Sequence, residues 1–342
     1  MILSSPIVMA ATIISLLCST QSAAAQDDAP VLRGQDLPIS RLSLSSTSSL
    51  TVESTIGELL MHPALQGFAD RILPWAGRDY DRNMPIRQIE HLLPYHSEVR
   101  PQVVLDGINR IIADRSSGKP VFHEIYSEAE RRADPDLRET GLFFFAGPPG
   151  APFAIIAPGG GFSYVGSVHE GFPYAQDINA SGFNAFVLTY RTGRGGQVAT
   201  QDLARAIDYV MDHASDLLVS QEGYSLWGSS AGARMAASIG SHGPRAFAAR
   251  TTDRPAAVVM AYTSHADYNA IEPPVYVVVG EKDRIAPPQN MSARVRKLID
   301  MGIKTEFRIV PDVAHGFGLG SGTKAEGWVR DAAMFWKQHL PQ

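Results

Sequence analysis

Three side chains in the second half of the chain are of the types that carry out nucleophilic acyl transfer. Ser230 is the centre of the pentapeptide GSSAG, Asp283 follows the apolar run PVYVVV, and His315 lies in the glycine-rich stretch VAHGFGLG. A serine becomes a nucleophile when a histidine takes its proton, and a carboxylate holds that histidine in the tautomer that can accept it. The sequence therefore predicts a triad of Ser230, His315 and Asp283.

Two of these assignments have competitors in the sequence. Glu281 lies two residues before Asp283 and could orient an imidazole instead; we favour Asp283 because it lies further out along the loop. His265 follows the apolar run AAVVMAY and could serve as the base. We favour His315 because its loop follows the last predicted strand, from which the ring can fold back towards Ser230.

A second glycine-rich loop could supply backbone donors for the oxyanion of a tetrahedral intermediate. The run FAIIAPGGGF ends in three glycines, so the N–H groups of Gly160 and Gly161 can point into a cavity without a side chain in the way. Together with Ala231, directly after the serine, they form the predicted oxyanion hole. Four neighbouring residues are candidates for a substrate pocket, although packing on the sheet is an equal alternative for the aromatic ones: Phe162, Tyr164, His169 and Ser229.

These loops require elements that bring them to one edge of the molecule. From Pro120 onward, short apolar runs alternate in the later part with helical patterns, which is typical of a mostly parallel sheet covered by helices on both faces. Strands are predicted within 121–126, 141–147, 153–161, 184–190, 224–227, 256–262, 274–280 and 305–310. Helices are predicted at 171–181, 201–214, 231–241, 289–301 and 325–339. GSSAG thus stands between a strand and a helix, where a nucleophile elbow is expected.

The order of a strand with a triple-glycine loop, a GxSxG elbow, a strand with Asp and a strand with His resembles the α/β-hydrolase fold. Within that superfamily, PGGGFSYVGSVHEGFPYAQDINASGFNAFVLTYR, GSSAG and AHGFGL resemble a branch of secreted esterases that includes acetylxylan-esterase-like proteins and other small carboxylesterases. The resemblance covers residues 143–340. One departure is Pro158, which stands where many relatives carry the histidine of His-Gly-Gly-Gly.

The resemblance implies a serine carboxylic-ester hydrolase with Ser230 as nucleophile, His315 as base and Asp283 as the orienting acid. The expected substrates are short-chain acyl esters, such as acetyl esters, of small molecules or carbohydrates, and no metal or organic cofactor is needed. An acyltransferase or an amidase or peptidase with the same triad is an alternative. A non-catalytic binding protein of this fold is a further alternative, which the complete set of three residues disfavours.

The first 119 residues carry none of these motifs. Residues 1–25 are apolar and then small, ending in an A-x-A site, and predict a signal peptide and an exported protein, periplasmic or secreted. Residues 26–54 contain a serine-rich stretch and are predicted to be a flexible linker. Residues 55–119 predict short helices interrupted by prolines, which either cap the active site or pad the fold, and 120–342 is the predicted catalytic domain.

Composition excludes several classes of partner. The 30 basic and 35 acidic residues give a net charge of −5 without a basic block, so neither nucleic acid nor an anionic membrane surface is an expected partner. The single cysteine is Cys18, within the predicted signal peptide. The mature chain is therefore expected to have no disulfide, no thiolate nucleophile and no cysteine-ligated metal. The apolar run 7–18 is short for a membrane span, and no stable membrane span is expected in the mature chain.

Overall fold

The computed structural model describes residues 48–341. The predicted signal peptide and most of the predicted linker lie outside the described residues. Within the described range, the helices of residues 55–119 and the sheet belong to the same structural unit.

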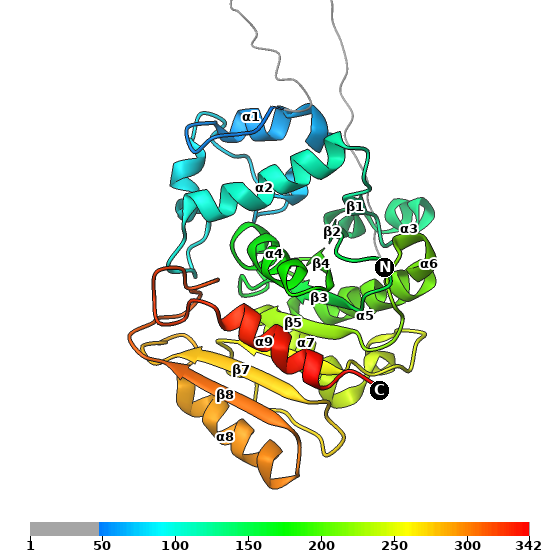
Figure 1. Cartoon of the computed structure of the whole chain (residues 1–342). Coiled ribbons are helices and arrows are strands. Elements are labelled where there is room, and N and C mark those ends of the chain that lie inside the picture. The colour runs from blue at the N-terminus through cyan, green and yellow to red at the C-terminus, as the bar shows by residue number, and fades with distance from the viewer. Residues whose placement is uncertain (1–47, 342) are drawn as a thin grey trace, which may run out of the picture. The chain divides into compact units, whose positions relative to one another are not determined.

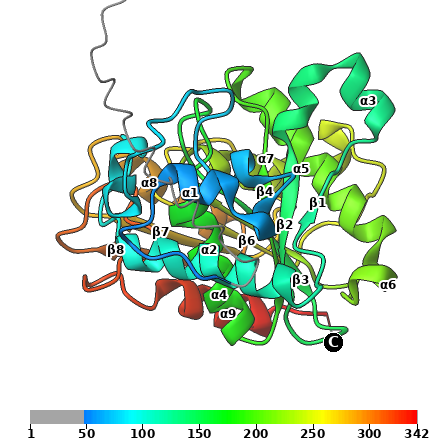
Figure 2. The ribbon, with the colours of Figure 1, turned by 90° about the horizontal axis from the view of Figure 1, so that it is seen from above.

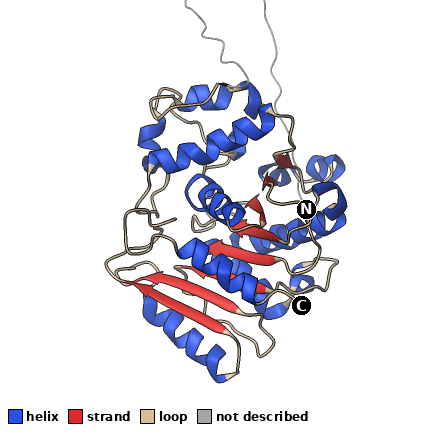
Figure 3. Ribbon diagram, in the orientation of Figure 1, coloured by secondary structure: helices blue, strands red, loops and turns tan. Residues whose placement is uncertain are grey.

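An eight-stranded sheet forms the centre of this unit (Figures 1 and 3). The strand order is β1-β2-β4-β3-β5-β6-β7-β8; β2 runs antiparallel to both of its neighbours, and every pair from β4 to β8 is parallel. The strands are β1 Phe122–His123, β2 Gly141–Phe145, β3 Phe153–Ala157, β4 Asn184–Thr189, β5 Ser225–Ser229, β6 Ala257–Ala261, β7 Val275–Gly280 and β8 Thr305–Val310. The predicted mostly parallel sheet is confirmed.

Helices cover both faces of the sheet, as expected. The helices are α1 Ile56–Met61, α2 Pro101–Ser116, α3 Glu128–Ala133, α4 Phe172–Ala180, α5 Gly195–Asp212, α6 Ala214–Leu217, α7 Ala231–His242, α8 Pro288–Asp300 and α9 Trp328–Gln338. Side chains of α2, α4 and α9 share one apolar core, and those of α5, α7 and α8 share the other. Alternate residues of the strands enter opposite cores, as Leu226 and Trp227 of β5 do. Figures 1 and 2 show α4 beside α9 on one of these faces.

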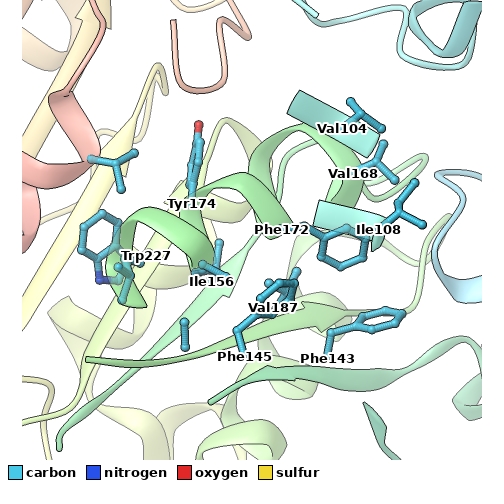
Figure 4. Close-up of a cluster of buried hydrophobic side chains, with 14 of the residues drawn as sticks. Val104, Ile108, Phe143, Phe145, Ile156, Val168, Phe172, Tyr174, Val187 and Trp227 are labelled. Carbon is cyan, nitrogen blue, oxygen red and sulfur yellow. The ribbon is translucent and has the colours of Figure 1, made fainter. Parts of the chain in front are cut away.

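The N-terminal helices are packed against the layer of α4. Figure 4 shows Val104 and Ile108 of α2 next to Val168 and Phe172, in the same buried cluster. A β-carbon on Gly107 would lie 2.7 Å from the β-carbon of Phe172. The glycine therefore allows α2 and α4 to approach each other closely at this point. Burial of each of these aliphatic side chains contributes about 1.5–3 kcal/mol relative to exposure.

Candidate active site

Ser230 lies in a sharp turn between β5 and α7. Its backbone angles are φ 50° and ψ −111°, a region that costs a non-glycine residue about 1–3 kcal/mol, and its N–H donates to the Ala261 carbonyl at 2.9 Å. The flanking glycines are required sterically. A β-carbon on Gly228 would lie 2.3 Å from the Gly232 backbone, and one on Gly232 would lie 1.8 Å from the Ala157 oxygen. The turn therefore presents Ser230 at its apex, as a nucleophile elbow does.

The structure brings Ser230, His315 and Asp283 into one chain of hydrogen bonds. Nε2 of His315 lies 3.0 Å from Oγ of Ser230, and Nδ1 lies 2.7 Å from Oδ2 of Asp283. Because a carboxylate can only accept, Nδ1 must be the donor in the second bond. That tautomer leaves Nε2 as an acceptor for the hydroxyl proton of Ser230, which is the arrangement that a general base requires.

Backbone amides hold the carboxylate of Asp283 in place. Its Oδ1 accepts the N–H groups of Ile285 at 2.9 Å and Ala286 at 2.7 Å, and its side chain is fully buried. Both oxygens of the carboxylate therefore have partners, and Oδ2 is directed at His315.

The two competing residues lie outside this chain of hydrogen bonds. Glu281 is exposed, and its carboxylate accepts the N–H of Asp312 at 3.1 Å instead. His265 is 8% exposed, and burial together with the charges of Arg294 and Arg234 lowers its pKa to about 4. Within the described chain, no hydrogen bond joins either residue to Ser230 or His315.

The triple-glycine loop after β3 lies against the elbow. A β-carbon on Gly159 would lie 3.1 Å from the β-carbon of Ser230. Gly160 and Gly161 have φ values of 135° and 63°, which favour glycine. The N–H groups of Gly160, Gly161 and Ala231 form no hydrogen bond within the part of the chain that the structure describes. The Ala231 amide also opens the N-terminus of α7, where an anion is stabilised.

Three of the four residues expected near a substrate pocket lie in the interior with protein partners. Ser229 is fully buried, and its hydroxyl donates to the hydroxyl of Tyr174 at 3.2 Å. Tyr164 is also fully buried and accepts the N–H of Tyr95 at 3.1 Å. His169 is 4% exposed, and its Nε2 lies 3.0 Å from the carbonyl oxygen of Gly316. We therefore do not assign these three residues to a substrate pocket.

Phe162, the fourth of these residues, lines a cavity of about 280 Å³. The walls also include Arg234 and Met235 from the second turn of α7, together with Phe247 and His265. The guanidinium of Arg234 lies 5.9 Å from the centre of the Phe162 ring. This cavity thus combines an aromatic wall, a cation and a neutral imidazole, and several of its residues flank the elbow or the glycine loop in sequence.

A second, larger cavity, of about 410 Å³, is like the first not lined by Ser230, His315 or Asp283. Trp75, Tyr80, Val165 and Tyr190 are among its walls, so it lies between the N-terminal segment and the end of β4. Its size alone does not connect it with the chemistry of Ser230.

Glu170 is a member of the site that the sequence did not reveal. It is fully buried, and its carboxylate accepts the N–H of Gly159 at 2.5 Å. The only signal in the sequence is an acid beside His169 in the mostly apolar stretch VHEGFPYA, directly before a predicted helix. That pattern by itself does not distinguish a buried carboxylate from an exposed one.

No group of three or more His, Cys, Asp or Glu side chains in residues 48–341 is arranged to hold a metal ion. None of the helices in that range is long and apolar enough to cross a membrane.

Comparison with known proteins finds similarity to several hydrolases. Residues 258–342 match the prolyl oligopeptidase family. The chain is 24% identical over 214 residues to endo-1,4-beta-xylanase B of Butyrivibrio fibrisolvens, and 21% identical over 223 residues to an acetylxylan esterase of Xylanibacter ruminicola. These matches cover 51% and 56% of this chain but 34% and 46% of the two proteins. The chain thus matches less than half the length of either relative.

A solved structure is similar over most of its own length. The acetyl ester-xyloside bifunctional hydrolase from Caldicellulosiruptor lactoaceticus matches 64% of this chain and 95% of its own, with a TM-score of 0.55 and 20% identity. At this level of identity the likeness shows a shared fold.

Proposed function

We propose that this chain, which has the α/β-hydrolase fold, is a serine esterase that cleaves carboxylic esters through Ser230, His315 and Asp283. The observation that carries the proposal is the continuous hydrogen bonding from Asp283 through His315 to a serine on a strained elbow. Fold alone does not imply an activity, whereas a nucleophile, a base in the accepting tautomer and an orienting acid do.

The proposed reaction has two steps. Nε2 of His315 takes the hydroxyl proton of Ser230 as Oγ bonds to the ester carbonyl carbon, and the N–H groups of Gly160, Gly161 and Ala231 hold the oxyanion. His315 then gives the proton to the leaving oxygen, the carbon–oxygen bond breaks, and the alcohol departs from an acyl-enzyme. Water repeats the sequence, releasing the acid and restoring the serine.

We infer short-chain acyl groups on carbohydrates or small molecules as the substrate class. Support comes from two similar proteins, named an acetylxylan esterase and an acetyl ester-xyloside hydrolase. The cavity of about 280 Å³ beside Phe162 is of a size that suits a small group rather than a long acyl chain. We propose that part of the ester enters there.

A peptidase or amidase is the second candidate, because residues 258–342 match the prolyl oligopeptidase family. With the same three side chains, Ser230 could attack an amide carbonyl. Amide cleavage differs from ester cleavage in that His315 must protonate an amine, which is a poorer leaving group than an alcohol. An acyltransferase would use the same acyl-enzyme with an alcohol in place of water.

The test combines covalent labelling with a substrate panel. A fluorophosphonate should label Ser230 in the wild-type chain and fail to label Ser230→Ala, while Ser229→Ala should keep labelling and most activity, since Ser229 bonds to Tyr174 and not to His315. Acetyl esters of p-nitrophenol and acetylated xylo-oligosaccharides should be turned over faster than longer acyl esters and peptide anilides. Labelling at another residue, or a clear preference for anilides, would reject the esterase proposal.

A further inference from the structure

The buried carboxylate of Glu170 joins segments that are distant in sequence. Oε2 accepts the N–H of Gly159 at 2.5 Å. Oε1 accepts the hydroxyl of Tyr262 at 2.7 Å and lies 3.0 Å from Nε2 of His96. Both side chains of the His96–Glu170 pair are nearly or fully inaccessible, at 2% and 0% exposed. A buried carboxylate is costly unless hydrogen-bond donors surround it, and the carboxylate of Glu170 has such donors.

The electrostatics keep this carboxylate ionised. Burial by itself would raise the pKa of Glu170, but His96, its hydrogen bond, His169 and the hydroxyl of Tyr262 outweigh burial and lower the pKa to about 2. Hydrogen bonds to a charged acceptor are stronger than those between neutral groups. The Gly159 amide is therefore held by one of the stronger bonds in the site.

The position of Gly159 determines where the next amide points. The carbonyl of Gly159 and the N–H of Gly160 belong to one rigid peptide plane and point in opposite directions. That carbonyl accepts the N–H of Gly166 at 2.9 Å, and the preceding peptide is tied to Glu170. A β-carbon on Gly166 would lie 2.9 Å from Nε2 of His96, so the imidazole packs directly against this anchor. His96 and Glu170 thus restrict the orientation of the peptide that carries the Gly160 N–H, one of the proposed oxyanion donors.

The same network extends beneath the nucleophile. The hydroxyl of Tyr262, which donates to Glu170, lies 2.8 Å from the hydroxyl of Tyr174. Tyr174 in turn accepts the hydroxyl of Ser229, the residue before Ser230. One carboxylate is therefore connected to both the glycine loop and the elbow.

The residues beside His96 contact the loop that carries the base. The hydroxyl of Ser97 donates to the carbonyl of His315 at 2.8 Å, and its N–H donates to the carbonyl of Gly316 at 3.0 Å. A β-carbon on Gly316 would lie 2.5 Å from the carbonyl oxygen of Tyr95. Tyr95 and Ser97 therefore contact the loop that carries His315. His96, which lies between them, packs against Gly166, whose N–H donates to Gly159.

We propose that His96 and Glu170 are positioning residues, through which the N-terminal segment, residues 48–119, holds the oxyanion loop in its donor geometry. The inference rests on the proposed function. It assigns the segment a part in catalysis through its contacts with the oxyanion loop.

The experiment compares variants of the full chain with matched controls. The side chain in Glu170→Gln is neutral, and its amide nitrogen cannot accept the hydrogen bonds that the carboxylate accepts. This variant should lower kcat about 10²–10³-fold, which is the range for losing one oxyanion donor, with KM changed less than threefold. His96→Leu should act in the same direction, and His96→Gln, which keeps an N–H donor, should recover most of the loss. The controls are Glu272→Gln, in a buried pair with Arg294 at 2.6 Å, and His62→Gln, in a buried site of the same segment. Both should lower the melting temperature while kcat of the folded protein stays unchanged.

The binding of a trifluoromethyl ketone separates positioning from stability. Its hemiketal oxyanion uses the same donors, so its Ki should rise by the factor by which kcat falls. A folded Glu170→Gln with kcat and Ki within threefold of the wild type would overturn the inference. If the wild type is labelled by fluorophosphonate but hydrolyses no ester, the proposed substrate is wrong, and the labelling rate of Glu170→Gln still decides the inference. A wild type that is not labelled would overturn both.

Discussion

At the scale of single residues, two carboxylates compete for one role and differ in their surroundings. Asp283 has both oxygens engaged, one by the amides of residues 285 and 286 and one by His315. Glu281 is exposed and bonded to the amide of Asp312. A buried carboxylate that amides hold in place orients an imidazole better than an exposed carboxylate does. The exposed side chain would first have to be fixed in one conformation, at a cost in entropy.

We expect Asp283→Asn to lower kcat about 10⁴-fold, because an amide can donate to Nδ1 and so favour the wrong tautomer of His315. Glu281→Gln should change kcat by at most a few-fold. Steady-state kinetics of the two variants under one assay, with circular dichroism as a check on folding, compare them directly. If Glu281→Gln were the inactive variant, the acid would be misassigned; loss of activity in His265→Ala but not in His315→Ala would reassign the base.

At the scale of elements, the contact between α2 and α4 shows how the N-terminal helices are built into the molecule. Val104 and Ile108 bury their side chains on either side of Gly107, where the helices come closest. A helix that served only as a mobile lid would not need an interface of this kind, because lids are drawn from the less stable parts of a structure.

Gly107→Ala tests this interface. Alanine favours a helix over glycine by about 1 kcal/mol, yet its β-carbon would lie 2.7 Å from that of Phe172, and overpacking costs about 1–3 kcal/mol. We expect a net loss of up to about 2 kcal/mol in the free energy of unfolding, measured in urea. The control is Asp106→Ala, an exposed position of the same helix, which should change stability by less than 0.5 kcal/mol. Stabilisation by Gly107→Ala would show that the interface is loose.

At the scale of the whole molecule, buried histidines link stability to pH. Burial, with smaller contributions from neighbouring charges, lowers the pKa values of His123, His169 and His265 to about 4. Between the unfolded value near 6.5 and that folded value, the unfolded chain binds protons that the folded chain does not. Stability must therefore fall as the pH falls through this window.

We expect the free energy of unfolding to decrease from pH 6.5 towards pH 4, with His169, the most deeply buried of the three, contributing up to about 1.4 kcal/mol per pH unit. Below that range, protonation of Glu170, whose pKa is also lowered, acts in the same direction. Urea titrations at pH 7, 6 and 5 measure the slope. A flat profile, or greater stability at pH 5 than at pH 7, would contradict the burial of neutral imidazoles.

Export also concerns the whole molecule and stays a prediction, since residues 1–25 lie outside the described part. We propose cleavage after the A-x-A site, so that the mature chain begins at Gln26 or within a few residues of it. N-terminal sequencing of the protein recovered from its native host, with cell fractions separated, measures this. An intact Met1 on protein from the cytoplasmic fraction would refute export.

Most of the fold could be predicted from local patterns in the sequence. Strand runs and helix periodicity depend on neighbouring residues, and the glycines of GSSAG signal a turn too tight for side chains. The start of α5 was less predictable: the helix begins at Gly195, six residues before the predicted 201, because the Gly195–Gly196 pair reads as a turn. The layering followed from the alternation of strands and helices, whereas the strand order, with β4 between β2 and β3, was not predicted.

The sequence by itself determined the strands and helices, the elbow around Ser230 and a short list of partners for it, because hydrophobic periodicity and steric need for glycine are local properties. Only the tertiary structure decided which histidine meets Ser230 and which acid meets that histidine, since those contacts span 85 and 32 residues along the chain. It alone placed Ser229, Tyr164 and His169 in the interior. It alone surrounded Glu170 with partners from separate segments, because long-range packing, and not neighbouring sequence, selects the partners of a buried polar group.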